Sequence, residues 1–70
     1  MLVVEITVEP VELYKILKFE GLVSSGAEAK LVIGNGLVHV NGEVETRKRR
    51  KIVANDQIEF NGATLRIELA

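Results

Sequence analysis

Apolar and polar residues alternate along five segments of the chain, and the apolar positions are rich in Val and Ile. A period of two with β-branched residues is typical of half-buried strands. We therefore predict strands over residues 2–8, 37–40, 43–46, 57–60 and 64–69. Asn41–Gly42 and Asn61–Gly62 separate neighbouring segments, and Asn-Gly is the strongest short signal for a hairpin turn. Asn55–Asp56 indicates a further turn, because Asn tolerates positive φ.

Between residues 10 and 36 the apolar period changes to three and four, which predicts two short helices. Leu13, Ile16 and Leu17 form one apolar stripe, and Pro10 stands where a first helical residue is favoured. The first helix is therefore expected over residues 11–20, with Gly21 ending it in a left-handed conformation.

A capping pattern marks the second helix, since Ser25 is followed three residues later by Glu28. Apolar residues then repeat at helical spacing until the glycines at 34 and 36, which predicts a helix over residues 25–35. We expect the two apolar stripes to be buried together, with a shared core of Leu13, Leu17, Ala29, Val32 and Ile33.

The order of these elements is a strand, two helices and four short strands, which indicates the α+β class. We expect a two-helix hairpin packed on one face of a small, largely antiparallel sheet of four to five strands. With 70 residues, no Cys and one His, we expect a single domain over residues 1–70 without disulfides or a metal site.

Several functions are made improbable by what the chain lacks. No residues stand in the pattern of a catalytic triad, a carboxylate pair or a P-loop, so we expect no enzyme, no small-molecule substrate and no cofactor. The first ten residues contain no Lys or Arg, which is not the pattern of a secretory signal. No apolar run approaches the ~20 residues of a membrane span. We therefore expect a cytoplasmic protein without a membrane partner.

The charges of the chain are distributed unevenly although they sum to −1. Residues 15–51 hold eight of the nine Lys and Arg and sum to +4, against −3 for residues 1–14 and −2 for residues 52–70. A polyanion meets the local field, because charges beyond about 8 Å are screened at physiological salt. Five consecutive cations, residues 47–51, are predicted to form an exposed connection with the forked and flexible donors that phosphates attract.

Four motifs in this order resemble the S4-like RNA-binding domain, the family named after ribosomal protein S4. They are LKFEGLV at residues 17–23, SSGAEAK at 24–30, GLVHVNG at 36–42 and NDQIEF at 55–60. The longer string VNGEVETRKR at residues 40–49 is similar to the small stand-alone YbcJ-type members of this family.

The resemblance implies an alpha-L fold, in which the helical hairpin and the adjoining strand connection form an RNA-binding surface. Lys18, Ser25 and Lys30 match the contact positions on the hairpin. Leu31 and Gly34 stand where many members have further basic residues. This departure shifts the expected contact area from the second helix to residues 47–51.

We therefore predict a non-enzymatic, monomeric protein that binds structured RNA through phosphate contacts. Ribosomal or transfer RNA is the expected target, and the ribosome or a ribosomal precursor is a candidate partner. The predicted RNA-binding residues, expected on one surface away from Glu5, Glu9 and Glu68, are Lys18, Ser25, Lys30, Arg47, Lys48, Arg49, Arg50 and Lys51. Stacking of bases is not expected, because the three aromatic residues, Tyr14, Phe19 and Phe60, fit core or partly buried positions.

Other interpretations remain open. Residues 47–51 could instead dock an acidic protein partner, which makes the chain an adaptor. They could also be a solvated loop neutralised by Glu43, Glu45 and Asp56. Because the RNA-binding interpretation also expects an exposed loop, substitutions at residues 47–49 should change stability little. A sulfur-carrier-like β-grasp protein has a similar size, but it requires a C-terminal Gly-Gly and this chain ends in Glu68-Leu69-Ala70.

Overall fold

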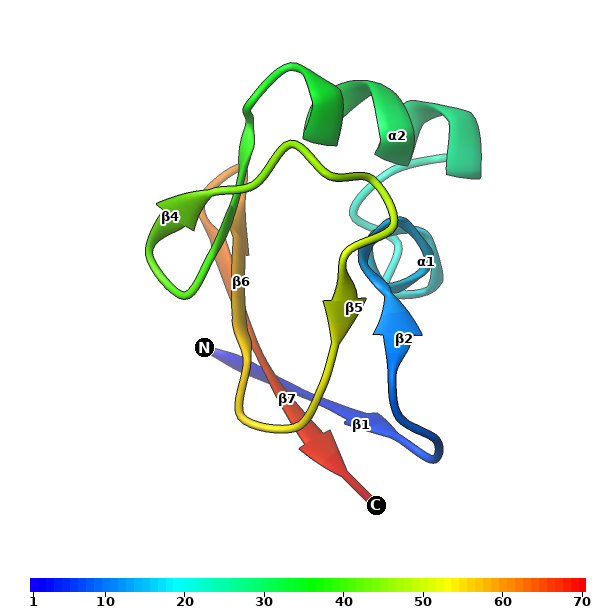
Figure 1. Cartoon of the computed structure of the whole chain (residues 1–70), viewed down its shortest axis with the longest axis vertical. Coiled ribbons are helices and arrows are strands. Elements are labelled where there is room, and N and C mark those ends of the chain that lie inside the picture. The colour runs from blue at the N-terminus through cyan, green and yellow to red at the C-terminus, as the bar shows by residue number, and fades with distance from the viewer.

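The computed structural model describes all 70 residues and has the α+β order that the sequence predicts (Figure 1). Its elements are β1 (Leu2–Ile6), β2 (Val11–Glu12), α1 (Leu13–Phe19), α2 (Gly26–Gly34), β3 (Val38–Val40), β4 (Glu43–Val44), β5 (Lys51–Ile52), β6 (Gln57–Phe60) and β7 (Ala63–Leu69). Neither helix is long and apolar enough to cross a membrane.

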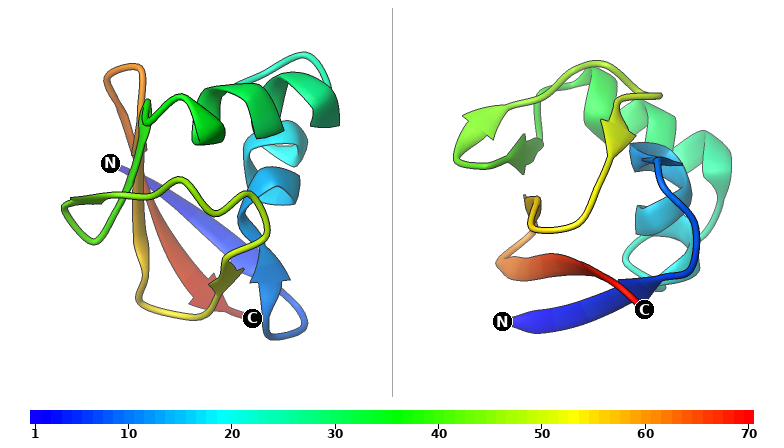
Figure 2. Two further views of the ribbon diagram at one scale, coloured as in Figure 1. Left: turned by 45° about the horizontal axis from the view of Figure 1, so that its top comes forward. Right: turned by 60° about the horizontal axis from the view of Figure 1, so that its bottom comes forward.

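Five strands form a curled sheet in the order β1-β7-β6-β3-β4 (Figure 2). The pairs β3–β4, β3–β6 and β6–β7 are antiparallel, as expected. β1 pairs in parallel with the last strand, β7, which the alternation along single segments could not indicate. The hairpin turns lie where predicted, with positive φ at Asn41, Asn55 and Asn61.

The prediction that Pro10 begins a helix is wrong. Residues 11 and 12 are extended and form a separate two-stranded sheet, in which Val11 pairs with Ile52 and Glu12 with Lys51. Because this pairing is made with a distant part of the chain, it overrides the local helical pattern. α1 therefore begins at Leu13, two residues later than expected.

The cap predicted for α2 is confirmed. The backbone N–H of Glu28 donates to Oγ of Ser25 at 3.1 Å. The Glu28 carboxylate in turn accepts from the N–H and the hydroxyl of Ser24, at 3.2 and 3.1 Å. The chain leaves the helix through Gly36 at φ +76, a conformation that glycine adopts without steric cost.

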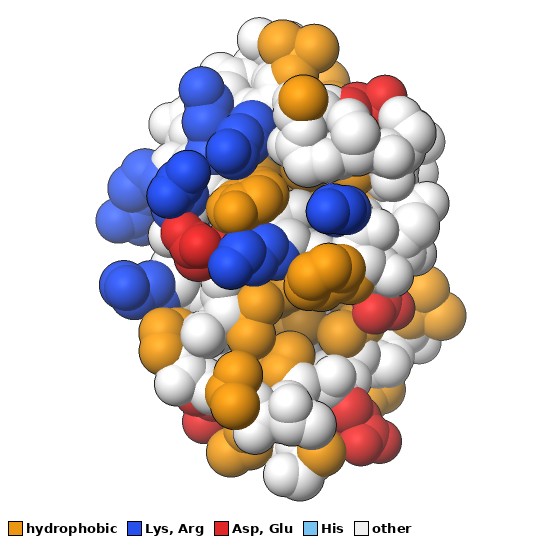
Figure 3. Space-filling view, turned by 90° about the vertical axis from the view of Figure 1, so that its right-hand side faces the viewer, with side chains coloured by type: hydrophobic (Ala, Val, Ile, Leu, Met, Phe, Trp, Pro, Cys, Tyr) orange, Lys and Arg blue, Asp and Glu red, His pale blue; other side chains and the backbone are white.

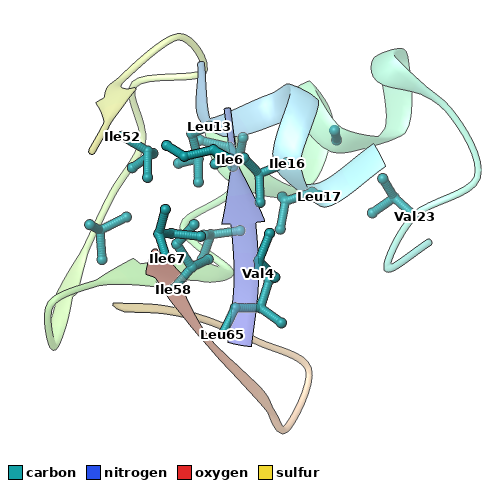
Figure 4. Close-up of a cluster of buried hydrophobic side chains, with 14 residues drawn as sticks. Val4, Ile6, Leu13, Ile16, Leu17, Val23, Ile52, Ile58, Leu65 and Ile67 are labelled. Carbon is teal, nitrogen blue, oxygen red and sulfur yellow. The ribbon is translucent and has the colours of Figure 1, made fainter. Parts of the chain in front are cut away.

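A core of 14 buried apolar residues fills the space between the helices and the sheet (Figure 4). Leu13, Leu17, Ala29 and Ile33 are fully buried in it, as the helical stripes predict, whereas Val32 packs against its edge. Ile52 of β5 is also fully buried. Since Ile52 follows residues 47–51, it fixes one end of the basic segment to the core.

Candidate nucleic-acid interface

The basic segment follows β4 and ends on the first residue of β5, Lys51; residues 45–51 are here called the basic loop. This loop runs across the start of α1, and the sequence and structure give α1 no side-chain cap (Figure 1). Instead, the N–H of Leu13 donates to the carbonyl of Arg50 at 2.9 Å, and the N–H of Tyr14 donates to that of Lys48 at 3.2 Å. The first N–H groups of a helix need external acceptors, so these two bonds fix the loop to α1.

Glu45 anchors the loop from inside. It is the only charged residue in the core region, with 5% of its surface exposed. Its carboxylate accepts from the Arg47 side chain at 2.9 and 3.0 Å, from the Arg47 N–H at 2.9 Å and from Arg50 Nη1 at 2.8 Å. These bonds, led by the Arg47 side chain, lower the pKa of Glu45 to about 2, while the same contact raises the pKa of Arg47.

This arrangement corrects the view of the loop as merely solvated. Of the three acidic residues expected to neutralise it, only Glu45 does so; Glu43 is exposed on β4, and Asp56 accepts from Asn41 and the N–H of Val53. Arg47 nevertheless keeps 72% of its side chain exposed, against 29% for Arg50. The buried carboxylate therefore orders the loop while one of its partners still faces solvent.

Tyr14 joins the loop to both helices. Its half-buried ring on α1 has Lys30 Nζ at 4.6 Å from the centroid, Arg49 Cζ at 5.8 Å and Lys15 Nζ at 5.9 Å. Cations at such distances are attracted by the negative face of the ring. The expectation that Lys30 and the basic segment share one surface is thereby confirmed.

Lys48 lies against the second helix. A Cβ atom at Gly34 would be 3.2 Å from Cε and 3.9 Å from Nζ of Lys48, so the Lys48 side chain crosses α2 where that helix lacks one of its own. The basic loop thus supplies a positive charge at Gly34, the position on the second helix where the sequence lacks the basic residue of many family members.

Lys and Arg side chains gather over one region of the face drawn in Figure 3, here called the cationic surface. We define it by Lys15, Lys18, Lys30, Arg47, Lys48, Arg49, Arg50 and Lys51. The ninth Lys or Arg of the chain, Arg66, lies on β7 and pairs with Glu68 at 3.8 Å. Glu12 is the acidic residue within the surface, 3.4 Å from Lys15 and 3.9 Å from Arg49.

The remaining predicted residues are at the hairpin end of this surface. Lys18 is exposed, and its Cδ would lie 4.0 Å from a Cβ at Gly26, at the start of α2. Ser25 is exposed as well, but its Oγ already accepts the capping bond. The lysine is therefore available for an external contact, whereas the Ser25 oxygen accepts the capping bond and its O–H can still donate.

The chemistry of the surface favours anions. Arg47, Arg49, Arg50 and Lys51 line a hollow of about 600 Å³ that has no apolar lining residue. No group of three or more His, Cys, Asp or Glu side chains is placed to hold a metal ion. Guanidinium and ammonium groups so arranged can donate to several phosphate oxygens at once.

Comparison with known proteins identifies the class of protein. The model of the S4 domain family matches residues 4–68, so the chain belongs to that family. YbcJ of Escherichia coli (strain K12) is 51% identical over 57 residues, which are 81% of each chain, and YbcJ of Shigella flexneri matches equally.

The fold agrees with this assignment. The solution structure of E. coli YbcJ, described as revealing an alpha-L motif involved in RNA binding, has a TM-score of 0.74 and 45% identity. The match covers 97% of this chain and 87% of YbcJ. The chain therefore has the alpha-L fold.

Two features of the surface were missed by the sequence reasoning. Glu45 was counted only as a neutralising charge, because the 5% exposure that makes it an anchor depends on tertiary packing. Tyr14 was assigned only to a core or partly buried position, and its contacts with cations from three segments depend on the tertiary structure.

Proposed function

We propose that the protein binds structured RNA, ribosomal or transfer RNA, without catalysing a reaction. The observation that carries the proposal is the cationic surface, in which the ordered loop and the helical hairpin meet at Tyr14. Its relative YbcJ is described as having an alpha-L motif involved in RNA binding, which supports the same role here.

Phosphate contacts are the proposed mode of binding. Lys48, Arg49 and Lys51 are exposed, and the one ion pair among them is that of Arg49 with Glu12 at 3.9 Å. Their donors can therefore reach RNA oxygens with little loss of internal bonding. Arg47 can add a further contact from its exposed edge while Glu45 holds it. Such contacts position a protein on a helix but read little sequence, so we expect recognition of shape.

The experiment is RNA binding measured over a salt series. Each phosphate contact contributes roughly 0.7–0.9 to the negative slope of log K against log salt. Replacing Lys48, Arg49 and Lys51 together by Ala should reduce the slope by about two to three and weaken binding to all structured RNAs alike. Arg47 is left intact, because its loss would also disturb Glu45.

Arg66→Ala is the control, since it removes a cation outside the surface, and it should leave the slope unchanged within about one contact. Unchanged affinity and slope in the triple variant would overturn the proposal. In that case capture of an acidic protein through residues 47–51 becomes the leading alternative. Cytoplasmic location and association with ribosomes stay predictions.

A further inference from the structure

The most exposed aromatic side chain of the protein lies beside the cationic surface. Phe19, the last residue of α1, has 69% of its surface exposed, although the sequence placed it in an apolar pattern. Large apolar side chains left in water carry a free-energy cost that binding can recover. Lys18 Nζ lies 5.9 Å from the centroid of its ring.

Phe19 forms one wall of an apolar groove. The groove has a volume of about 300 Å³, and six of its nine lining residues are hydrophobic: Val4, Ile6, Val8, Val11, Ile16 and Phe19. Glu5 and Glu20 line it as well, and no Lys or Arg does.

The groove opens toward the cationic surface. An adjoining hollow of about 540 Å³ shares Val8, Val11 and Phe19 with it. This hollow is also lined by Lys15 and Lys51, and by Glu12, which pairs with Lys15 at 3.4 Å and leaves the opening with one net positive charge. Figure 3 shows hydrophobic side chains directly below the gathered Lys and Arg side chains. The two hollows therefore adjoin through Val8, Val11 and Phe19, with Lys15 and Lys51 in one of them and Glu5 and Glu20 in the other.

We propose that this groove binds one unpaired nucleotide of the RNA, with its base against Phe19 and its phosphate at Lys15 and Lys51. The inference rests on the proposed function and adds a base-binding site to it. A nucleotide of adenine, guanine or cytosine presents an anion for the two lysines, a flat ring face for Phe19 and an amino group that a glutamate can accept from. An apolar peptide or an acyl chain has no anion to match the two lysines at the opening.

This site favours RNA with an unpaired nucleotide over a continuous duplex. Bases in a helix are stacked and cannot reach an aromatic side chain, whereas a bulged base can swing out and stack on it. Loss of such an aromatic contact weakens binding roughly five- to hundredfold. The cationic surface itself binds both kinds of RNA.

The test compares two hairpin RNAs that differ only by one bulged adenosine. The native protein should bind the bulged RNA more tightly, and Phe19→Ala should remove that preference while leaving affinity for the fully paired hairpin unchanged. Phe19→Trp should retain the preference and Phe19→Leu should lose most of it, because only the indole keeps a ring face. Leu37→Ala is the control, since Leu37 is 54% exposed beside a hollow without Lys or Arg.

Several results would overturn the inference without touching the proposed function. One is equal binding of the two RNAs by the native protein, with the salt dependence intact. Another is that Phe19→Ala weakens both RNAs equally or neither, and a third is that Phe19→Leu behaves as the native protein. Failure of the native protein to bind either RNA would instead overturn the proposed function, and this inference with it.

Discussion

Replacing Glu45 by Gln tests whether a buried carboxylate holds the basic loop in place. The substitution keeps the size of the side chain but removes the charge that accepts four hydrogen bonds from Arg47 and Arg50. The Gln amide would also turn an N–H₂ donor toward two cations. We therefore expect both a less stable protein and a less ordered loop.

The size of the effect follows from the pKa of Glu45. That pKa falls from 4.5 to about 2 on folding. Each pH unit corresponds to about 1.4 kcal/mol, so the carboxylate stabilises the fold by at most roughly 3–4 kcal/mol. The Arg47 side chain is 72% exposed, so solvent screens part of its interaction with Glu45 and lowers this stabilisation. We expect Glu45→Gln to cost about 2 kcal/mol, or roughly 8–16 °C in Tm for a domain of this size.

The pH dependence has a definite sign. Because the pKa of Glu45 is lower in the folded state, its contribution is complete above pH 4.5 and is lost as the pH falls toward 2. Urea unfolding followed by circular dichroism should show a difference of about 2 kcal/mol between the two proteins at pH 7, shrinking towards zero near pH 2. A difference below about 0.5 kcal/mol at pH 7, or one that does not change with pH, would refute the reasoning.

Three further predictions concern the surface and its support. Tyr14→Leu should weaken RNA binding roughly two- to fivefold, whereas Tyr14→Phe, which keeps the ring, should bind normally in the same titration. Ser25→Ala should lower the free energy of unfolding by about 1 kcal/mol in urea, because α2 loses its cap. Gly34→Ala should raise the free energy of unfolding by about 0.5 kcal/mol, because alanine favours the helix and the flexible end of Lys48 can move aside. Gly36→Ala should lower it by about 1 kcal/mol, because φ is +76 there. Equal effects of the two glycine substitutions would contradict this account.

The parts of the fold that the sequence predicted are those governed by local chemistry. Asn41–Gly42 and Asn61–Gly62 form turns because of their own conformational preferences, and Ser25 caps a helix through a bond to a residue three positions away. The apolar stripes of the helices predicted buried residues correctly for the same reason, since helical spacing places Leu13 and Leu17 on one face. These features need no knowledge of distant segments.

The features that the sequence did not predict depend on contacts between distant segments. The extended conformation at Val11 comes from pairing with Ile52, and β1 becomes the parallel edge strand because β7 has a free side. Phe19 follows the apolar period of α1, yet the sheet does not cover it. In the candidate site, the cationic segment was evident from residues 47–51. The partners of Glu45 are also local, but the burial that makes Glu45 an anchor comes from the packing of the tertiary structure around it.

The most direct test of the central claim is an NMR titration of the protein with a structured RNA hairpin. The claim is that one surface, made by the basic loop and the helical hairpin and centred on Tyr14, binds the RNA. The account predicts the largest amide shifts over residues 45–51 and at Tyr14 and Lys30, with small shifts around Arg66 on β7. Shifts concentrated on β7 and β1, or no shifts at low salt, would contradict it.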